Sequence, residues 1–526
     1  MFGNKKKIAE LRENWAKPID KFRNFDFISF LFVSLSSNTD KENYVDENTW
    51  KDLNFDDIFS LMDRNISPIG QQYLYYILHK YEKDQSVLNK RTELIDLFKN
   101  NSDLREKIQL ELIRLDTTNS YFIAPLLFGE LPNRPRFYQL FFILSFIAII
   151  SVVLIFFNGV FIFVTIAIFL INLIINNIYS KRIHEHFAGF SSLNLLLVTV
   201  YSLIKNNSDD IEELKIFENK KHIIKKINKK IGSLVLDKAA MNDMLSGIVD
   251  YLNIYFLYDL IKFSTSVGLL KKHQSLLKET YLTIAKLDSS ISIASYLNNV
   301  QHYCNPTFIN KKSITFQNIY HPLIVNAVTN NLIDLDKSLL ITGSNMAGKT
   351  TFIKTIGINL IFSQSINLCL ASKAEIPKLF VKSAIRREDN LEDSKSYFFV
   401  EVEELLKFIQ TSEISGNYIF LIDEIFRGTN TIERLASSTS VLEYLNINNF
   451  VLVTTHDIEL QDMLNNTFDM IHFSERVNNN KFFFDYKLQM GPTSSGNAIK
   501  LLEIKGYPKS IIENSNKISK SLLNKK

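Results

Sequence analysis

The sequence is short of residues that interrupt helices or cross-link chains. Its 526 residues include 16 glycines, 10 prolines and 2 cysteines. Because glycine and proline are the usual helix breakers, their scarcity favours long helices and places the few glycines at special backbone positions. With only Cys304 and Cys369 present, a disulfide framework is excluded and a reducing compartment is favoured.

Neither sign of charge is in large excess. The 60 basic and 56 acidic residues leave a formal charge of +4, which excludes a polycation that works by bulk charge. Hydrophobic residues make up 46% of the chain and charged residues 22%, so global disorder is excluded. At roughly 100–200 residues per domain, more than one domain is expected. The first residues are basic without an apolar run behind them, so no cleaved signal peptide is predicted.

One long block, residues 140–175, has no charged residue. Asn158-Gly159, a turn pair, divides it into halves of about 16–18 residues that span about 24–27 Å each as helices, close to the thickness of a hydrocarbon core. Basic residues flank the block on both sides, namely Arg134, Arg136, Lys181 and Arg182. The sequence therefore predicts a transmembrane helical hairpin over 138–178 with both flanks in the cytoplasm, in the cytoplasmic (inner) membrane. The alternative is a buried hairpin in the core of a soluble protein.

The spacing of apolar residues along the chain changes near residue 311. Before this point, apart from the block, apolar residues recur at helical spacing. After it, short apolar runs that suit strands alternate with helical stretches, which is typical of a parallel sheet with crossover helices. We expect a helical segment (1–45), a helical domain in two parts (46–133 and 183–310) and an α/β domain (311–526).

The clearest motif is GSNMAGKT at 343–350, a full match to the phosphate-binding loop pattern. An apolar run precedes it and a helical stretch follows, as the motif requires. Gly343 and Gly348 permit the backbone angles that turn N–H groups towards phosphates. Lys349 is expected to neutralise the β- and γ-phosphates, and Thr350 to offer its hydroxyl to Mg²⁺.

Two later apolar runs end in polar residues. After YIFLI come Asp423, expected at Mg²⁺, and Glu424, expected to polarise the attacking water. After FVLV comes His456, which is placed to contact the γ-phosphate or the water. The alternatives are a solvated strand end for the two carboxylates and a structural role for the histidine.

These segments resemble the ATPase domain of the MutS family of DNA mismatch-repair proteins. The resemblance rests on ITGSNMAGKTTF, DNLEDSKSYFFVEVEEL, FLIDEIFRGTNTIERLA and VTTHDIEL, and runs from Tyr320 to the GPTSSGNAIKLLEIKGYPKSII segment. It implies an ABC-type P-loop fold, ATP and Mg²⁺ as cofactors, and work as a homodimer with nucleotide near the subunit interface. Less specifically, DIFSLMDRNISPIGQQYLYYIL and LKETYLTIAKLDSSISIASYLNNVQHYCNPTF resemble parts of the family's lever domain.

The resemblance also implies roles for single residues. Glu424, His456 and Lys349 are the expected catalytic residues, and Thr350 and Asp423 the expected metal ligands. The expected nucleotide-binding residues are Gly343, Ser344, Asn345, Met346, Ala347, Gly348, Lys349, Thr350, Thr351 and Ser396. Ser396 would face the partner subunit's nucleotide, with an ordinary helix cap as the alternative, and Arg427, Gly428 and Thr429 would lie at the dimer contact.

The sequence departs from the family in several places. Ser344 and Ala347 replace a usual proline and glycine, and Leu332 lies near where many members place an aromatic on the adenine. About 45 residues precede the lever-like start, too few for the mismatch-reading and connector domains. Mismatch recognition is therefore not carried over.

The stretch NKKHIIKKINKKI (219–231) places six lysines around Ile223, Ile227 and Ile231. This stretch suits a solvated helix face, contact with DNA phosphates or an anionic membrane surface.

Taken together, the motifs and the apolar block predict a membrane-anchored dimeric ATPase, with the lipid bilayer as a partner and DNA as a candidate partner. The alternatives are an ABC-type transporter ATPase, although the signature LSGGQ is absent, and a nucleotide-gated membrane scaffold.

Overall fold

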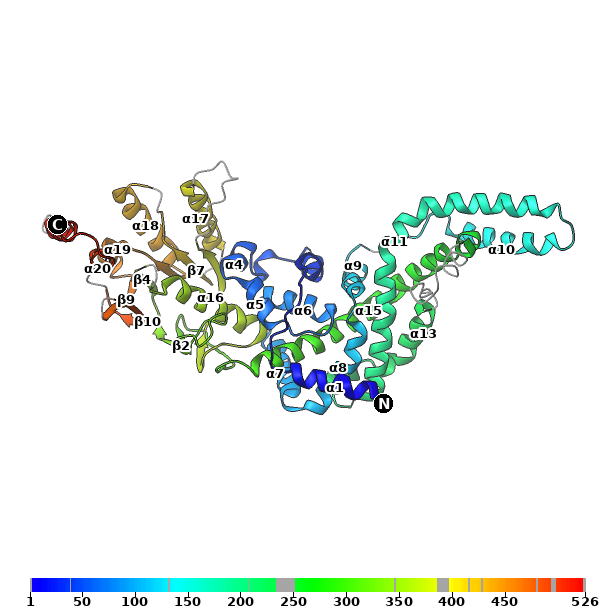
Figure 1. The fold of residues 1–526 in the computed structure, drawn as a ribbon, viewed down its shortest axis with the longest axis horizontal. Coiled ribbons are helices and arrows are strands. Elements are labelled where there is room, and N and C mark those ends of the chain that lie inside the picture. Colours follow the sequence, from blue (N-terminus) through cyan, green and yellow to red (C-terminus); the bar gives the residue numbers. More distant parts are fainter. Residues whose placement is uncertain are drawn as a thin grey trace. The chain divides into compact units, whose positions relative to one another are not determined.

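The computed structural model describes residues 2–37, 39–130, 133–207, 209–232, 251–344, 347–385, 397–414, 417–426, 429–478, 481–492 and 498–523. The chain forms two compact units (Figure 1). The helical unit comprises residues 1–40, 61–76 and 93–299, and the α/β unit comprises 41–60, 77–92 and 300–526. Two short segments, 41–60 and 77–92, therefore belong to the α/β unit although they precede the apolar block in sequence.

The expectation of a largely helical N-terminal part and a C-terminal α/β domain is confirmed. Before residue 300 the named helices are α1 (Phe2–Asn14), α2 (Phe25–Ile28), α3 (Phe30–Ser36), α4 (Glu47–Asp52), α5 (Phe55–Met62), α6 (Pro68–His79), α7 (Gln85–Asn100), α8 (Ser102–Leu112), α9 (Ile123–Phe128), α10 (Tyr138–Ile155), α11 (Phe161–Asn207), α12 (Glu212–Lys215), α13 (Lys221–Gly232) and α15 (Tyr258–Leu297).

The apolar block folds into α10 and the first part of α11, with Asn158-Gly159 between them (Figure 1). Helix α11 continues without a break for 47 residues, well beyond the apolar block. Within the part of the chain that the structure describes, three stretches are long and apolar enough to cross a membrane by length and composition, namely Tyr138–Ile155, Phe161–Tyr179 and Ala188–Asn207. Only 17% and 11% of the first two are buried within the protein, against 56% of the third.

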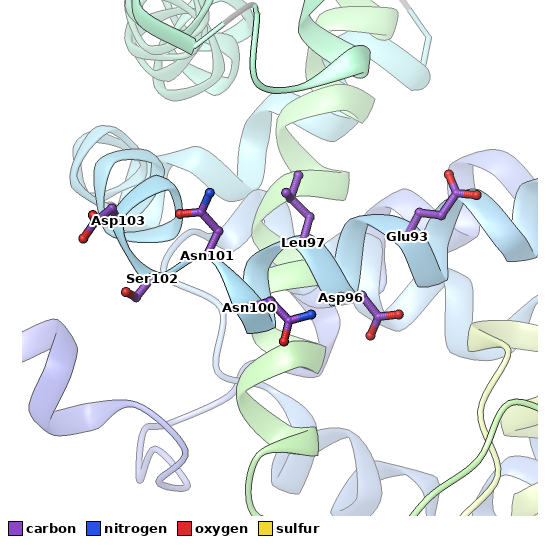
Figure 2. Close-up of a pocket in the computed structure, with 7 residues that line it drawn as sticks. All are labelled: Glu93, Asp96, Leu97, Asn100, Asn101, Ser102 and Asp103. Atoms are coloured by element: carbon purple, nitrogen blue, oxygen red, sulfur yellow. The ribbon is translucent and has the colours of Figure 1, made fainter.

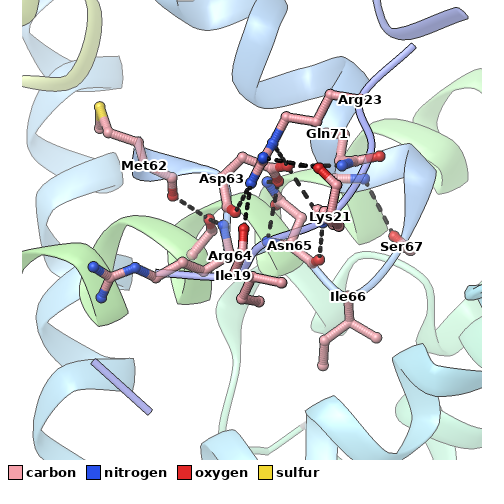
Figure 3. Close-up of polar contacts among 12 residues, drawn as sticks. Ile19, Lys21, Arg23, Met62, Asp63, Arg64, Asn65, Ile66, Ser67 and Gln71 are labelled. Atoms are coloured by element: carbon pink, nitrogen blue, oxygen red, sulfur yellow. Dashed lines mark hydrogen bonds and ion pairs between the residues drawn. The ribbon is translucent and has the colours of Figure 1, made fainter. Parts of the chain in front are cut away.

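A buried polar cluster ties the N-terminal segment to the loop between α5 and α6 (Figure 3). The carboxylate of Asp63, which is fully buried, accepts hydrogen bonds from Arg23 Nε at 2.9 Å and Gln71 Nε2 at 2.7 Å. Lys21 Nζ lies 3.3 Å from the same carboxylate and donates to the carbonyl of Asn65 at 2.9 Å. The cluster fixes residues 21–23 because a buried charge must keep its partners.

A second buried carboxylate, Asp288 on α15, caps the start of α6. It accepts hydrogen bonds from Ile66 N at 3.1 Å, Ser67 N at 2.8 Å and Ser67 Oγ at 2.6 Å. Burial raises the pKa of Asp288 to about 6, against the lowering effects of these hydrogen bonds and of Lys21.

This shift predicts a pH dependence for the α6 start. Because the folded pKa lies above the ordinary value of 3.8, the folded state binds the proton more tightly. The resulting stabilisation is complete below pH 3.8 and is lost as pH rises through about 6, by at most about 3 kcal/mol. Hydrogen-exchange protection of the Ile66 and Ser67 amides should therefore be higher in the wild type than in Asp288→Asn. This difference should be larger at pH 4.5 than at pH 7.5. An equal difference at both pH values would show that Asp288 does not titrate there.

The α/β unit is built on two sheets. The larger has the order β10-β9-β4-β8-β7-β6 and the smaller the order β1-β5-β2-β3. The strands of the larger sheet are β4 (Ser338–Gly343), β6 (Phe380–Ala384), β7 (Tyr418–Asp423), β8 (Phe450–Thr454), β9 (Phe468–Asn478) and β10 (Lys481–Met490); those of the smaller are β1 (Thr307–Phe308), β2 (Ile314–Ile319), β3 (Asn330–Leu335) and β5 (Lys373–Ile376). In the larger sheet, only the β9–β10 pair is antiparallel.

Helices cover the larger sheet and form its core. They are α16 (Lys349–Ile366), α17 (Tyr397–Ile414), α18 (Thr431–Asn446) and α19 (Glu459–Leu464), followed by α20 (Ala498–Ile504) and α21 (Lys509–Leu523). Phe408 of α17 and Leu442 of α18 pack with Phe420 and Val451 of the central strands. Helix α16 contacts β4, β6, β7 and β8. The packing holds the carboxyl ends of three central strands at one edge.

The basic stretch 219–231 forms α13, and its apolar side is used for packing. Ile224, Ile227 and Ile231 are buried, and the helix contacts α11 and α15. Ile223 is only half-buried, so Ile224 takes the place expected for it. Since no apolar face is left over to enter a lipid surface, insertion of α13 by its isoleucines is excluded. Its exposed lysines are Lys225, Lys226, Lys229 and Lys230.

Candidate active site

Three strand ends meet at one edge of the larger sheet. β8 lies between β4 and β7, and all three are parallel, with Ile341 and Asp423 both opposite Thr454. The carboxyl edge of a parallel sheet is where ligands of such folds bind. The three motifs of the sequence are therefore neighbours in space although more than 100 residues separate the first from the last.

The loop after β4 depends on two glycines with left-handed backbone angles. Gly343 has φ +135° and Gly348 has φ +101°. A Cβ at Gly343 would lie 2.5 Å from the carbonyl oxygen of Phe473. Only glycine combines that conformation with that contact, so the first glycine of the motif is required by the fold as well as by its expected ligand.

Lys349 is the first residue of α16, and its ammonium lies beneath the loop. The residue is 2% exposed. Its Nζ donates to the carbonyl oxygens of Gly343 at 2.7 Å and Ser344 at 3.0 Å, and lies 3.5 Å from His456 Nε2. The buried Ala347 closes the turn through its N–H, which donates to Ser344 O at 3.2 Å. A buried cation at a helix N-terminus makes the region suited to an anion.

Thr350 and Asp423 are joined by hydrogen bonds between their side chains. Thr350 Oγ1 donates to Asp423 at 3.1 Å (Oδ1) and 3.0 Å (Oδ2). The hydroxyl of Thr454 also donates to Asp423 Oδ1. The sequence did not point to Thr454, because only the strand register places it beside Asp423.

Glu424 and His456 contact each other directly. His456 Nε2 lies 2.9 Å from Glu424 Oε1. Glu424 has φ +62°, Phe426 has φ +55°, and the Glu424 N–H donates to Thr454 O at 3.1 Å. Left-handed non-glycine residues cost free energy and concentrate at functional sites. The contact shows that the histidine is positioned by the same carboxylate that was expected to orient water.

The residues present fit a triphosphate with Mg²⁺. The left-handed glycines and the buried ammonium suit phosphate oxygens, and the hydroxyl and carboxylate oxygens of Thr350 and Asp423 are the hard ligands that Mg²⁺ prefers. Among the described residues, no group of three or more His, Cys, Asp or Glu could hold a metal by itself.

Two further basic groups, Lys354 and His321, belong to this unit. Burial lowers the pKa of Lys354, which the charges of Asp52 and Asp423 partly oppose, and Lys354 Nζ donates to Asn54 Oδ1 at 2.7 Å. Burial and the charge of Lys354 lower the pKa of His321 to about 4. His321 is therefore neutral at physiological pH.

The other expected site residues divide into two groups. Asn345, Met346, Ser396, Arg427 and Gly428 lie outside the described residues. Thr351 lies on α16, and Thr429 Oγ1 donates to Glu433 Oε2 at 3.2 Å, beside the start of α18. Leu332 is buried in β3, so its side chain is not available to stack on a base.

The helical unit has a hollow of its own where α7 meets α8 (Figure 2). Its lining consists of Glu93, Asp96, Leu97, Asn100, Asn101, Ser102 and Asp103. Asn101 caps α8 by accepting from Leu104 N at 3.0 Å. Three carboxylates disfavour an anionic ligand, so the hollow does not compete with the phosphate loop as a nucleotide site.

The fold and the site define a class of protein, one with a helical part and an α/β domain that carries a phosphate-binding loop motif. The family model described as MutS domain V matches residues 339–523. Over these residues the chain is similar to this domain of the MutS family.

Similar proteins named DNA mismatch repair protein MutS come from several bacteria. The protein of Lactobacillus delbrueckii subsp. bulgaricus is 29% identical over 267 residues, which is 48% of this chain and 31% of that protein. The one from Leuconostoc citreum is 30% identical over 252 residues, which is 45% of this chain and 28% of that protein. The match thus covers less than a third of these relatives.

Proposed function

We propose that this protein is a membrane-anchored ATPase of the MutS type, a P-loop enzyme that binds and hydrolyses ATP as a homodimer. The observation that carries the proposal is the meeting of Lys349, Thr350, Asp423, Glu424 and His456 at one sheet edge. Each contact joins residues that the sequence separates widely. The proposal accounts for the position of a buried ammonium beside the polar ends of β7 and β8.

The chain's own residues have distinct tasks in this proposal. The loop amides and Lys349 hold the phosphates, and Thr350 and Asp423 hold Mg²⁺, which when bound neutralises charge on the phosphates. Glu424 accepts a hydrogen bond from the attacking water and takes its proton. His456, in contact with both Lys349 and Glu424, orients the carboxylate and reaches towards the terminal phosphate.

Replacing Lys349 by alanine tests the binding site. We expect the Kd for ATP to rise about 10- to 100-fold, because charge-assisted hydrogen bonds contribute about 1.5–3 kcal/mol. Lys354→Ala is the matched control, since Lys354 lies on the same helix but contacts Asn54. Equilibrium binding of a fluorescent ATP analogue gives both values. Equal affinity of the two variants would refute the assignment of the phosphate loop.

The proposed anchor is the hairpin of α10 and the first part of α11. Large apolar side chains are exposed along both helices, among them Phe146 (64%), Phe163 (72%) and Ile174 (61%). A buried core hairpin would cover these side chains, whereas a lipid environment suits them. The flanking arginines and lysines favour the cytoplasmic (inner) membrane, with the α/β unit in the cytoplasm.

The transporter alternative is weaker. The apolar halves of the hairpin contain no charged residue, and charged residues usually mark a substrate pathway through a membrane. The nucleotide-gated scaffold differs from the proposed ATPase only in its rate of ATP hydrolysis. Measured phosphate release by the wild type distinguishes it from an ATPase.

DNA is a candidate partner on two grounds. The relatives are named as DNA mismatch repair proteins, and α13 presents four exposed lysines, which suit phosphate contacts. If DNA is the effector, duplex DNA should raise ATP turnover in a salt-dependent way. No change at low salt would remove DNA from the proposal.

A further inference from the structure

The hairpin does not stand alone in the helical unit, because a third segment contacts both of its helices. Residues 251–256 are helical and lead through Leu257 into α15. The ring of Tyr255 stacks on Phe169 of α11 with centroids 6.2 Å apart. Its hydroxyl lies 3.0 Å from Ser151 Oγ of α10 and donates to Ala148 O at 3.2 Å. Tyr255 therefore contacts both helices of the hairpin.

Two polar side chains of the apolar hairpin are committed to this contact. Ser151 is 2% exposed and Asn172 is fully buried. Asn172 Nδ2 donates to the backbone carbonyl of Tyr255 at 2.6 Å. Polar groups in a bilayer are costly unless they are paired inside the protein. The hairpin thus carries polar groups at the two positions where residue 255 meets them.

The position of Asn172 gives the depth of the contact. Helix α11 starts at Phe161, next to the turn of the hairpin. At 1.5 Å per residue, Asn172 lies about 16 Å along the helix from Phe161 and about 10 Å before Tyr179. Tyr179 is the end of the apolar stretch. The backbone of Tyr255 therefore lies about 10 Å inside the membrane span, measured from its cytoplasmic end at Tyr179.

The backbone break at residue 257 is closed off from its surroundings. Leu257 has φ +50° and is fully buried. Its N–H donates to Ile254 O at 3.3 Å, and its carbonyl accepts from Ile261 N at 3.0 Å. The side chain of Asn253 accepts from Asp259 N at 2.8 Å. Irregular backbone is tolerated at membrane depth only where its polar groups are satisfied in this way.

We infer that residues 251–257 form a third membrane element, which lies within the cytoplasmic leaflet beside the hairpin. The inference rests on the proposed membrane anchor. It extends the lipid-facing surface from the hairpin to residues 251–257. Tyr251 (67%) and Leu252 (50%) are exposed and face the lipid. Tyr258, whose ring lies 4.2 Å from Lys262 Nζ, is placed at the headgroup level, where tyrosine and lysine are favoured.

Spin labels at three positions test the inference in the full-length chain. The background is Cys304→Ser with Cys369→Ala, reconstituted in phosphatidylcholine–phosphatidylglycerol nanodiscs. Leu252→Cys is the test site, Ile174→Cys is the hairpin site of similar depth, and Lys272→Cys is the water-exposed site on α15. Collision rates with oxygen and with a nickel chelate report lipid and water, respectively. We expect an oxygen-to-nickel ratio at Leu252 close to that at Ile174 and several-fold above that at Lys272.

The outcomes separate the inference from the anchor. A lipid-like Ile174 with a water-like Leu252 overturns the third element and leaves the anchor standing. A water-like Ile174 overturns the anchor, and the inference fails with it.

A second variant tests the contact itself. Asn172→Ala removes the donor to Tyr255 and should lower the oxygen-to-nickel ratio at Leu252 at least twofold. Thr165→Ala is the control, because Thr165 Oγ1 bonds only within its own helix, to Phe161 O at 3.1 Å. If Asn172→Ala leaves the Leu252 label unchanged, Asn172 does not hold the segment.

Discussion

Replacing Glu424 by glutamine is expected to lower the rate of ATP hydrolysis by about 10²–10⁴-fold, the usual contribution of a general base. Glutamine keeps the size of the side chain and still accepts a hydrogen bond from His456 Nε2, which lies 2.9 Å from the carboxylate. It cannot take a proton from water. Nucleotide binding should therefore persist while turnover is lost, which single-turnover phosphate release and equilibrium binding measure separately.

The control for this variant is Asp457→Asn. Asp457 follows His456 in sequence, but its carboxylate pairs with Arg434 at 2.7 Å. Loss of this charge should lower the rate of ATP hydrolysis much less than Glu424→Gln does. We expect the two rates to differ by at least tenfold. Hydrolysis by Glu424→Gln within twofold of the wild type would assign the proton transfer to another group. A wild type with no turnover would favour the scaffold.

The second large effect concerns stability and is expected at Asp63. Asp63→Ala leaves the guanidinium of Arg23, whose side chain is 10% exposed, without its partner at 2.9 Å. Removal of one partner of a buried ion pair costs about 3–5 kcal/mol. We expect hydrogen-exchange protection of the 61–76 segment to fall by that free energy, measured by mass spectrometry on the full chain.

Lys220→Ala provides the comparison within the same unit. Lys220 pairs with Glu279 at 2.9 Å, but the two side chains are 39% and 40% exposed. Exposed pairs contribute about 0–1 kcal/mol because water and salt screen them. If the two variants lose equal protection, the cluster around Asp63 does not hold the N-terminal segment in place.

The sequence predicted the parts of the site that local chemistry determines. The three apolar runs became β4, β7 and β8, because each is short and buried and ends in a polar or glycine residue. The loop glycines were predictable, since the motif requires left-handed angles and Gly343 and Gly348 have them. The apolar block was recognisable as a helical hairpin because uncharged length and one Asn-Gly pair suffice.

What the sequence could not supply depends on register and on distant contacts. Thr454 reaches Asp423 only because β7 and β8 pair in a particular alignment. Asp63 and Asp288 read as ordinary polar residues, and only the fold buries them beside Arg23 and Ser67. The family resemblance placed Leu332 near the base, but its side chain is buried in β3 of the smaller sheet.

Helix α11 is continuous but bent, because its first part belongs to the hairpin and its later part runs in another direction (Figure 1). The later part packs on α9 and α13. In the proposed anchor, a thinner or thicker bilayer would change the tilt of the first part. Because no loop interrupts the helix between its two parts, we expect that tilt to act directly on the bend.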